Sequence, residues 1–556
     1  MTGHAGRPLP RSTPAAEGVD AAGVLALVDA LGAEPGVEPH GLMLLRHGKV
    51  VAEGWWAPYA PHRPQLVYSL SKSFTSAAAG LAFGDGLIDL DAPVLRYFPE
   101  LDAEITDRRA RAIRVRHVAS MASGHLSDTV ERALAVDREH LVRGFLSLPV
   151  DREPGTVFAY NQPATYTLGT IVQRVTGKTL TQYLRPRLFE PLGIADAFWR
   201  QFPEGHDLAF SGLHTTVDAI ARLGQLHLAG GVWEGRRLLP AEWVAEATRP
   251  HVATAGPEPD LGSDWAQGYG FQCWMSRHGY RGDGAYGQYM LVLPEHDAVL
   301  ALTSDTEDMQ RVLDLVWQHL LPAFDSAPAA GAGAAGGDAV GAAGGSASGS
   351  AAAGSASDSA AGGDAGGDVA AADRELAARL EALALPPGEA AGAGPGPDWP
   401  DETHFTRAGT GPDDGADAEA GRAFFAAGDS PRDQPKLTAA RVARGADGAW
   451  TLTLTEDGRP LDLRFGGAGW TVDAADDARA RADADGVAGP GADAGPSRPP
   501  TAVTAGWTDP DTLVADVMTP HHLLVTCSRR TGTFTVRWRT RPLHLGRLVS
   551  YRAPRP

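Results

Sequence analysis

Hydrophobic and polar positions recur along the chain with two different periods, and these periods predict where helices and strands lie. Apolar side chains at three- and four-residue spacing predict helices over residues 19–31, 71–83, 165–176, 181–189, 217–229 and 308–321. Short apolar runs bounded by turn residues predict strands over residues 41–46, 50–56, 286–293 and 298–304. The first two strands form a hairpin around His47-Gly48-Lys49.

The order of these elements predicts a mixed fold of the α/β (α+β) class. Strands at both ends of the stretch, with helices between them, favour an antiparallel sheet whose two halves meet, with a helical subdomain inserted. The pattern does not repeat βαβ units, which disfavours a Rossmann or barrel topology.

The second half of the chain changes character twice. Residues 326–372 are almost entirely Ala, Gly, Ser and Asp, and such a tract has no large apolar side chains to offset the entropy of ordering. We therefore expect a flexible linker, followed over residues 373–387 by a short helix that Pro386-Pro387 ends.

From residue 398 to residue 556 the pattern is typical of β-structure. Asp457-Gly458 between two apolar runs is a strong hairpin signal, and a second hairpin is predicted over residues 523–539. These strands predict a small all-β domain, with a disordered insert over residues 476–500. Its role is left open between capping a site, binding a partner and stabilising the chain.

Composition narrows the class of protein. A length of 556 residues predicts two or three domains, and 43% hydrophobic residues is enough for real cores. The net charge of −19 argues against binding to nucleic acid or an anionic membrane. Two distant cysteines, Cys273 and Cys527, fit a reducing compartment. Without a secretory signal in residues 1–11 or a long apolar run, the cytoplasm is the predicted location.

The rarity of lysine draws attention to one position. Of 49 basic residues only four are lysine, namely Lys49, Lys72, Lys178 and Lys436. A desolvated lysine can lose its proton and act as a base, whereas arginine stays protonated. Lys72 lies three residues after Ser69 at the start of an apolar helix, so both side chains lie on one helix face. The alternative is a helix cap beside a surface lysine.

The residues around this pair resemble a known superfamily. Residues 68–76, Tyr-Ser-Leu-Ser-Lys-Ser-Phe-Thr-Ser, resemble the first motif of the serine β-lactamases and penicillin-binding proteins. The resemblance spans residues 17–322 and includes the stretches 86–100, 113–117 and 121–125. It is greatest to the branch of class C β-lactamases, family VIII esterases, D-aminopeptidases and 6-aminohexanoate-dimer hydrolases. It implies a β-lactamase/transpeptidase-like sheet flanked by helices.

The resemblance implies a second motif over residues 154–162. Tyr160 matches the tyrosine that shuttles protons in the family, and a lysine ammonium beside it would favour the phenolate. The family pattern Tyr-x-Asn is altered, because Gln162 stands in the third position and Asn161 in the second. Gln162 is expected to offer its amide to Lys72 or to a substrate carbonyl. His117 and His125 are expected to be structural.

The third motif departs most from the family. Where relatives carry Lys-Thr-Gly, this chain has Gly282-Asp283-Gly284, and no lysine lies nearby. In this register the backbone N–H groups of Ser69 and Ala285 form the oxyanion hole. Candidate substrate-binding residues are Ala285, Gln162, Gly284, Tyr286 and Gln288. Arg281 is expected on the opposite strand face, and the missing cation favours an esterase or amidase over a dedicated β-lactamase.

The sequence therefore predicts a serine hydrolase domain over residues 1–325 that acts on a small-molecule ester or amide. Ser69 is the predicted nucleophile, with Lys72 and Tyr160 as general base and acid, and neither a metal nor an organic cofactor is expected. A β-lactamase or D-amino-peptide hydrolase, and a binding protein without turnover, are the alternatives. His521-His522 near Cys527 is interpreted as a hairpin surface, and Trp265, Trp274 and Met275 as core or one wall of an acyl pocket.

Overall fold

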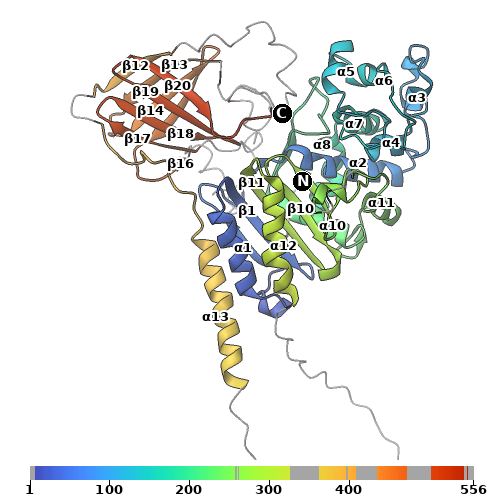
Figure 1. Ribbon diagram of the computed structural model, residues 1–556, viewed down its shortest axis with the longest axis horizontal. Helices are drawn as coiled ribbons and strands as arrows, with labels where there is room; N and C mark the ends of the chain where they lie inside the picture. The colour runs from blue at the N-terminus through green and yellow to red at the C-terminus, as the bar shows by residue number, and fades with distance from the viewer. Residues whose placement is uncertain are drawn as a thin grey trace, which may run out of the picture.

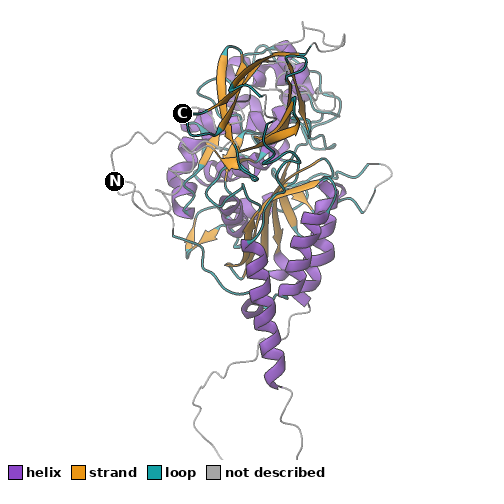
Figure 2. Cartoon of the chain, turned by 90° about the vertical axis from the view of Figure 1, so that its left-hand side faces the viewer, coloured by secondary structure: helices purple, strands orange, loops and turns teal. Residues whose placement is uncertain are grey.

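The computed structural model consists of a helix-flanked sheet, a helical region beside it, and a β-rich C-terminal domain (Figure 1). It describes residues 7–256, 260, 262–325, 362–395, 399–408, 434, 436–472, 502–543 and 548. The C-terminal domain lies at one end of the molecule, and helix α13 (Gly362–Glu381) extends towards the other end (Figures 1 and 2).

The sheet of the first domain has six strands in the order β2-β1-β11-β10-β9-β8, and every neighbouring pair is antiparallel. The strands are β1 (Val37–Arg46), β2 (Lys49–Trp55), β8 (Trp274–Met275), β9 (Tyr280–Gly284), β10 (Gln288–Leu293) and β11 (Ala298–Thr306). Because β1 pairs with β11, with Leu44 opposite Leu300, the two ends of the domain meet in the middle of the sheet. The predicted antiparallel sheet is confirmed.

Each face of this sheet is covered by its own helices. Helices α1 (Ala21–Ala33) and α12 (Met309–Asp325) pack together on one face, and α10 (Val217–Leu228) packs on the other against β10 and β11. Successive side chains of a strand point to opposite faces. Accordingly Leu300 and Leu302 lie in the core under α1 and α12, whereas Val299 and Ala301 lie in the core shared with α2 (Ser71–Gly84).

Between β2 and β8 the chain forms a mainly helical region. Its helices are α3 (Arg108–Arg111), α4 (Val115–Ala119), α5 (Val130–Val136), α6 (Leu141–Leu146), α7 (Gln162–Thr176), α8 (Leu180–Leu184), α9 (Glu190–Leu192) and α11 (Ala241–Ala247). Its short strands are β3 (Gln65–Leu66), β4 (Ala197–Trp199), β5 (Leu213–Thr215), β6 (Val232–Trp233) and β7 (Arg236–Arg237). The helix predicted over residues 181–189 is divided into α8 and a π-helical turn, Arg185–Phe189. Pro186 has no N–H to continue the regular ladder there.

The C-terminal domain is one nine-stranded sheet in the order β15-β14-β13-β12-β20-β19-β18-β17-β16. Its strands are β12 (Glu402–Arg407), β13 (Leu437–Arg444), β14 (Trp450–Glu456), β15 (Arg459–Phe465), β16 (Thr471–Val472), β17 (Ala502–Asp509), β18 (Thr512–Met518), β19 (His522–Ser528) and β20 (Thr533–Trp538). The sheet curls until β15 contacts β17, which nearly closes it. Both predicted hairpins are present, and Asp457 and Gly458 have the expected positive φ values of 49° and 74°. The insert predicted over residues 476–500 lies outside the described residues.

The connection between the domains differs from the prediction. Helix α13 begins at Gly362, so the expected flexible linker is wrong over residues 362–372, while residues 326–361 lie outside the described part of the chain. Leu380 and Leu383 are buried against the first domain, where a Cβ on Gly54 would come within 2.7 Å of Leu383. Leu380 lies in the last turn of α13 and Leu383 just after it, so this packing stabilises the end of the helix.

The turn between β18 and β19 also differs from the prediction of a hairpin surface. His521 and His522 are only 1% and 2% exposed, because the hairpin docks on the first domain. His522 Nε2 lies 2.7 Å from Glu38 Oε1, and its Nδ1 lies 2.8 Å from Asp516 Oδ1. Among the described residues, no group of three or more His, Cys, Asp or Glu side chains could hold a metal ion.

Candidate active site

Ser69 and Lys72 lie at the start of α2, where a short 3₁₀ turn, Tyr68–Leu70, runs into the helix. Their spacing of three residues places both on one side of the helix, and Lys72 Nζ lies 3.0 Å from Ser69 Oγ. Ser69 is partly exposed, whereas Lys72 is only 1% exposed. The hydroxyl is therefore open to a ligand while the amine is shielded from water.

Two further groups hold the Lys72 amine. Gln162 Oε1, at the start of α7, lies 2.8 Å from Nζ, and the backbone carbonyl of Phe210 lies 2.7 Å from it. The left-handed backbone of Ala209 (φ 65°) precedes that carbonyl in the turn. Gln162 thus reaches Lys72 as expected, although its longer side chain replaces the asparagine of the family pattern.

Burial is the main influence on the charge of Lys72. Desolvation lowers the pKa of Lys72 from 10.5 to about 7, and the charges of Asp128 and Asp283 act in the opposite direction. Near neutral pH a large share of the amine is consequently unprotonated. A neutral amine has a free electron pair, which an ammonium lacks, so this lysine can accept a proton.

Tyr160 completes the group. Its ring centroid is 4.7 Å from Lys72 Nζ, and its ring stacks on Trp274 at 5.4 Å. Burial raises the pKa of Tyr160 well above its ordinary value, although the influence of the Ser69 side chain partly opposes this. The expected phenolate is therefore wrong. Desolvation leaves the phenol protonated, and the amine is the group that loses charge.

The third motif lies against the turn that carries Ser69. A Cβ on Gly282 would lie 2.3 Å from Ser73 Oγ, and a Cβ on Gly284 would lie 2.2 Å from the carbonyl oxygen of Val67. Both positions therefore require glycine for the close approach of β9 to α2. Ala285, which is partly exposed, follows directly after this contact.

Tyr286 and Gln288 use their polar ends within the protein. The Tyr286 hydroxyl donates to the backbone carbonyl of Arg541 in the C-terminal domain, and Gln288 Nε2 donates to the carbonyl of Ser304 at 2.6 Å. The strand predicted from residue 286 begins at Gln288, because residues 285–287 form the turn before it. Neither placement favours a direct contact with substrate.

Arg281 is unavailable to an incoming ligand. Its side chain is fully buried, Nε donates to Asp283 Oδ2 at 3.0 Å, and Nη1 donates to the carbonyl of Asp264 at 3.0 Å. It shares its strand face with Asp283, away from the two glycines that meet α2, as expected from the two-residue period. Its guanidinium carbon lies 4.6 Å from the ring centroid of Trp265.

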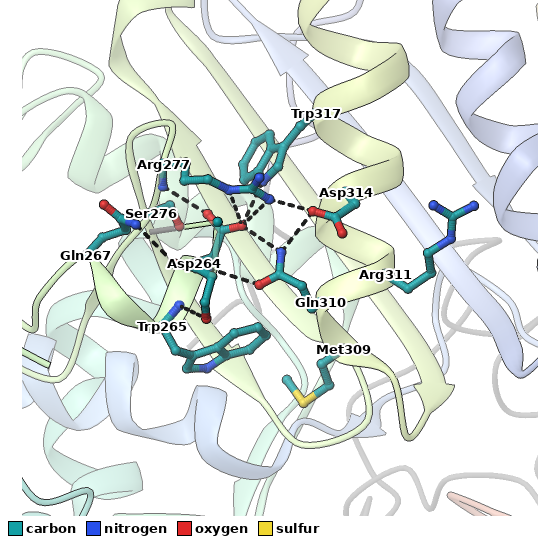
Figure 3. Close-up of polar contacts among 12 residues, drawn as sticks. Asp264, Trp265, Gln267, Ser276, Arg277, Met309, Gln310, Arg311, Asp314 and Trp317 are labelled. Carbon is teal, nitrogen blue, oxygen red and sulfur yellow. Dashed lines mark hydrogen bonds and ion pairs between the residues drawn. The ribbon is translucent and has the colours of Figure 1, made fainter. Parts of the chain in front are cut away.

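A polar cluster surrounds Asp264, whose backbone carbonyl accepts from Arg281 (Figure 3). Asp264 Oδ2 accepts from Arg277, from Gln310 at 2.9 Å and from Trp317 at 3.0 Å, the last two on helix α12. Burial alone would raise the pKa of Asp264, but these hydrogen bonds together hold it below its ordinary value. The cluster links the segment that carries Trp265 to helix α12 through hydrogen bonds.

The two histidines near the second motif lie apart from this group. His117 Nδ1 accepts from the backbone N–H of Arg114, and His125 Nδ1 pairs with Ser123 Oγ at 3.0 Å. Burial lowers the pKa of both imidazoles to about 4.

Sequence reasoning missed the Phe210 carbonyl and the influence of Asp128 on Lys72, since neither has a recognisable spacing from Ser69.

Comparison with known protein families gives a match. The model of the Beta-lactamase family matches residues 24–323, more than half of the chain. The chain belongs to this family. The resemblance seen in the sequence, the expected fold and the expectation of a serine hydrolase are thereby confirmed.

Individual known proteins show moderate similarity to this chain. The 6-aminohexanoate-dimer hydrolase of Paenarthrobacter ureafaciens is 29% identical over 287 residues, which cover 48% of this chain and 72% of that protein. The lovastatin esterase of Penicillium rubens is 29% identical over 151 residues, covering 23% of this chain and 38% of the esterase. The structure of D-amino acid amidase from Ochrobactrum anthropi SV3 has 20% identity and a TM-score of 0.43, covering 54% and 99% of the two chains. Within the described residues, no helix is long and apolar enough to cross a membrane.

Proposed function

We propose that this member of the Beta-lactamase family hydrolyses a carboxylic ester or amide through an acyl-enzyme on Ser69. The observation that carries the proposal is the contact between Ser69 Oγ and a buried Lys72 amine whose pKa is lowered to about 7. A serine hydroxyl is a weak nucleophile until an adjacent base takes its proton, and a desolvated lysine meets that need.

The partners of Lys72 support a direction for proton transfer. A neutral amine has two N–H bonds and one electron pair. When the N–H bonds donate to Gln162 Oε1 and the Phe210 carbonyl, both acceptors, the electron pair is directed to the Ser69 hydroxyl. We therefore assign to Gln162 the role of orienting the Lys72 amine, through its side-chain oxygen at the start of α7.

Acylation then proceeds in two steps. Ser69 Oγ forms a bond to the substrate carbonyl carbon while its proton moves to Lys72 Nζ, and the carbonyl electron pair moves to the oxygen. The backbone N–H groups of Ser69 and Ala285 would stabilise this oxyanion. When the C–O or C–N bond breaks, the leaving group takes a proton from the Tyr160 hydroxyl, which Lys72 then reprotonates.

Deacylation repeats the sequence with water in place of the serine hydroxyl. Water donates a proton to the Lys72 amine and bonds to the acyl carbon, and the Ser69–acyl bond breaks as Ser69 Oγ regains a proton. The acid leaves and the amine is neutral again. A single lysine therefore serves both half-reactions, with Tyr160 as the partner that carries protons to the leaving group.

The altered third motif supports an ester or amide substrate rather than a β-lactam. The family lysine is replaced by Gly282, and the neighbouring Arg281 is buried and committed to Asp283. Such a site fits a small-molecule ester or amide that does not need a cation to bind a substrate carboxylate. The curated relatives include a 6-aminohexanoate-dimer hydrolase and a lovastatin esterase, names that describe amide and ester substrates respectively.

Intact-mass spectrometry after brief exposure to p-nitrophenyl acetate tests the proposal. We expect an acetyl adduct in the wild type and none in Ser69→Ala, and faster turnover of the ester than of a chromogenic cephalosporin. Equal labelling of the two proteins would refute the choice of nucleophile. If the protein is not labelled by a fluorophosphonate and does not hydrolyse any ester, the result would favour a binding protein of the same fold.

A further inference from the structure

Two tyrosines flank the residues that supply the proposed oxyanion hole, and both have a left-handed backbone. Tyr68 (φ 46°) directly precedes Ser69, and Tyr286 (φ 68°) directly follows Ala285. Such a conformation is unfavourable for an aromatic residue and persists only where surrounding contacts hold it. The two rings meet edge to face with centroids 5.1 Å apart.

Both tyrosine side chains are held by the C-terminal domain. The Tyr68 hydroxyl lies 2.5 Å from His521 Nε2, in the turn between β18 and β19. The Tyr286 hydroxyl donates to the carbonyl of Arg541, after β20. The His521 ring also packs on Tyr286, with centroids 4.4 Å apart. One histidine of the C-terminal domain therefore touches the side chains on both sides of the proposed oxyanion hole.

The orientation of His521 is fixed from the first domain. Its Nδ1 lies 3.0 Å from Asp305 Oδ2 at the end of β11. A carboxylate can only accept a hydrogen bond, so in the neutral imidazole Nδ1 donates and Nε2 accepts from the Tyr68 hydroxyl. The resulting chain Asp305–His521–Tyr68 crosses the domain boundary and returns to the residue next to the nucleophile. All three residues are buried.

We propose that His521 is a positioning residue for the hydrolase, and that the docked C-terminal domain holds the Ser69 turn and the Ala285 turn in their reactive arrangement. The inference rests on the proposed function. Without the hydrogen bond to His521, the strained backbone at Tyr68 can relax and Ser69 Oγ moves relative to Lys72 and the oxyanion N–H groups. Because a misplacement of about 1 Å can cost about a hundredfold in rate, the effect falls on kcat more than on KM.

The neighbouring residue His522 provides a matched control. It is as buried as His521 and joins the same two domains, but its ring nitrogens pair with Glu38 and Asp516 instead of a tyrosine next to the site. Loss of His522 weakens the docking of the domains without removing a contact to Tyr68. A purely structural role of the hairpin predicts that the two histidine variants lose activity alike.

The test compares full-length His521→Ala, His521→Gln, Tyr68→Phe and His522→Gln in stopped-flow acylation with p-nitrophenyl acetate, alongside thermal unfolding. We expect His521→Ala and Tyr68→Phe each to lower kcat about 10- to 100-fold with KM within about threefold. A double variant that combines His521→Ala with Tyr68→Phe should lose little more than either single variant, because both substitutions remove the same contact. Glutamine at position 521 can still accept from Tyr68, so that variant should regain part of the rate.

The control should separate the two explanations. His522→Gln should keep kcat within about threefold of the wild type even where its unfolding temperature falls. Equal losses in the His521→Ala and His522→Gln proteins, or an unchanged kcat in Tyr68→Phe, would overturn the inference alone. A wild type without a Ser69-dependent burst would overturn the proposed function and the inference with it. Tyr68→Phe keeps the ring, so it remains informative where His521→Ala does not fold.

Discussion

Acylation by this protein should depend on pH through the Lys72 amine, and the structure sets the midpoint. A lysine with an ordinary pKa of 10.5 would be neutral in about 3 molecules in 10,000 at pH 7, whereas a pKa of about 7 leaves about half of the molecules neutral. Burial thus increases the population of the base about a thousandfold at that pH. The raised pKa of Tyr160 adds no second titration in the neutral range.

The assay is the acylation rate from the p-nitrophenolate burst, measured between about pH 5 and pH 9. Because the neutral amine is the reactive form, the rate should rise about tenfold per pH unit at the acidic end, pass its midpoint near 7 and then level off. Lys72→Arg keeps a positive charge that cannot be removed, so its rate should fall at least about a hundredfold at every pH, without a midpoint near 7.

Three results would refute this reasoning. A rate that falls as pH rises would mean that the protonated lysine is the reactive form. A rate that still rises about tenfold per pH unit at pH 9 would mean that burial does not lower the pKa in solution. An Lys72→Arg protein with a wild-type profile, and with an unchanged circular dichroism spectrum, would show that another group takes the Ser69 proton.

Other variants test separate parts of the site. Asp128→Asn removes a negative charge that raises the pKa of Lys72, so the midpoint of the burst profile should move to lower pH, and a move to higher pH would contradict this. Gly284→Ala places a Cβ 2.2 Å from the carbonyl of Val67, so kcat should fall at least about tenfold, and an unchanged kcat would count against the register of the third motif. Contacts with Glu38 and Asp516 outweigh burial and raise the pKa of His522 to about 10. A histidine whose folded pKa is raised stabilises the fold fully below about pH 6.5 and loses this contribution as pH rises through about 10. As pH rises through about 10, the free energy of unfolding measured with denaturant should therefore fall by up to about 5 kcal/mol more in the wild type than in His522→Gln. Equal falls in the two proteins would contradict the raised pKa of His522.

Local pattern was sufficient to predict those parts of the molecule whose signal lies in contiguous residues. The hairpin at Asp457-Gly458 follows from turn chemistry, and the contact between Ser69 and Lys72 follows from helix geometry. The antiparallel sheet followed from strands at both ends of the domain. The hairpin and the Ser69–Lys72 contact depend on short-range rules that tertiary packing did not override, whereas the sheet was predicted from the order of the elements along the domain.

Features that depend on packing between distant segments could not be predicted in this way. The carbonyl of Phe210 reaches Lys72 through a backbone turn and has no side-chain signature. Leu376 and Leu380 of α13 pack against the first domain, a contact between distant segments that the composition of the tract does not indicate. His521-His522 had the polar character of an exposed turn, and only the docked arrangement of the domains explains its burial.

The pairing of β1 with β11 has a consequence for biosynthesis. Val37 is made early and its partner Thr306 only near the end of the first domain, so the middle of the sheet cannot close while the ribosome is still adding the intervening helices. Contacts between segments so distant in sequence form slowly because the loop between them must first be ordered. The apolar strand β1 therefore lacks its β11 partner during most of the synthesis of the domain. A chaperone that shields this strand would raise the yield of active protein.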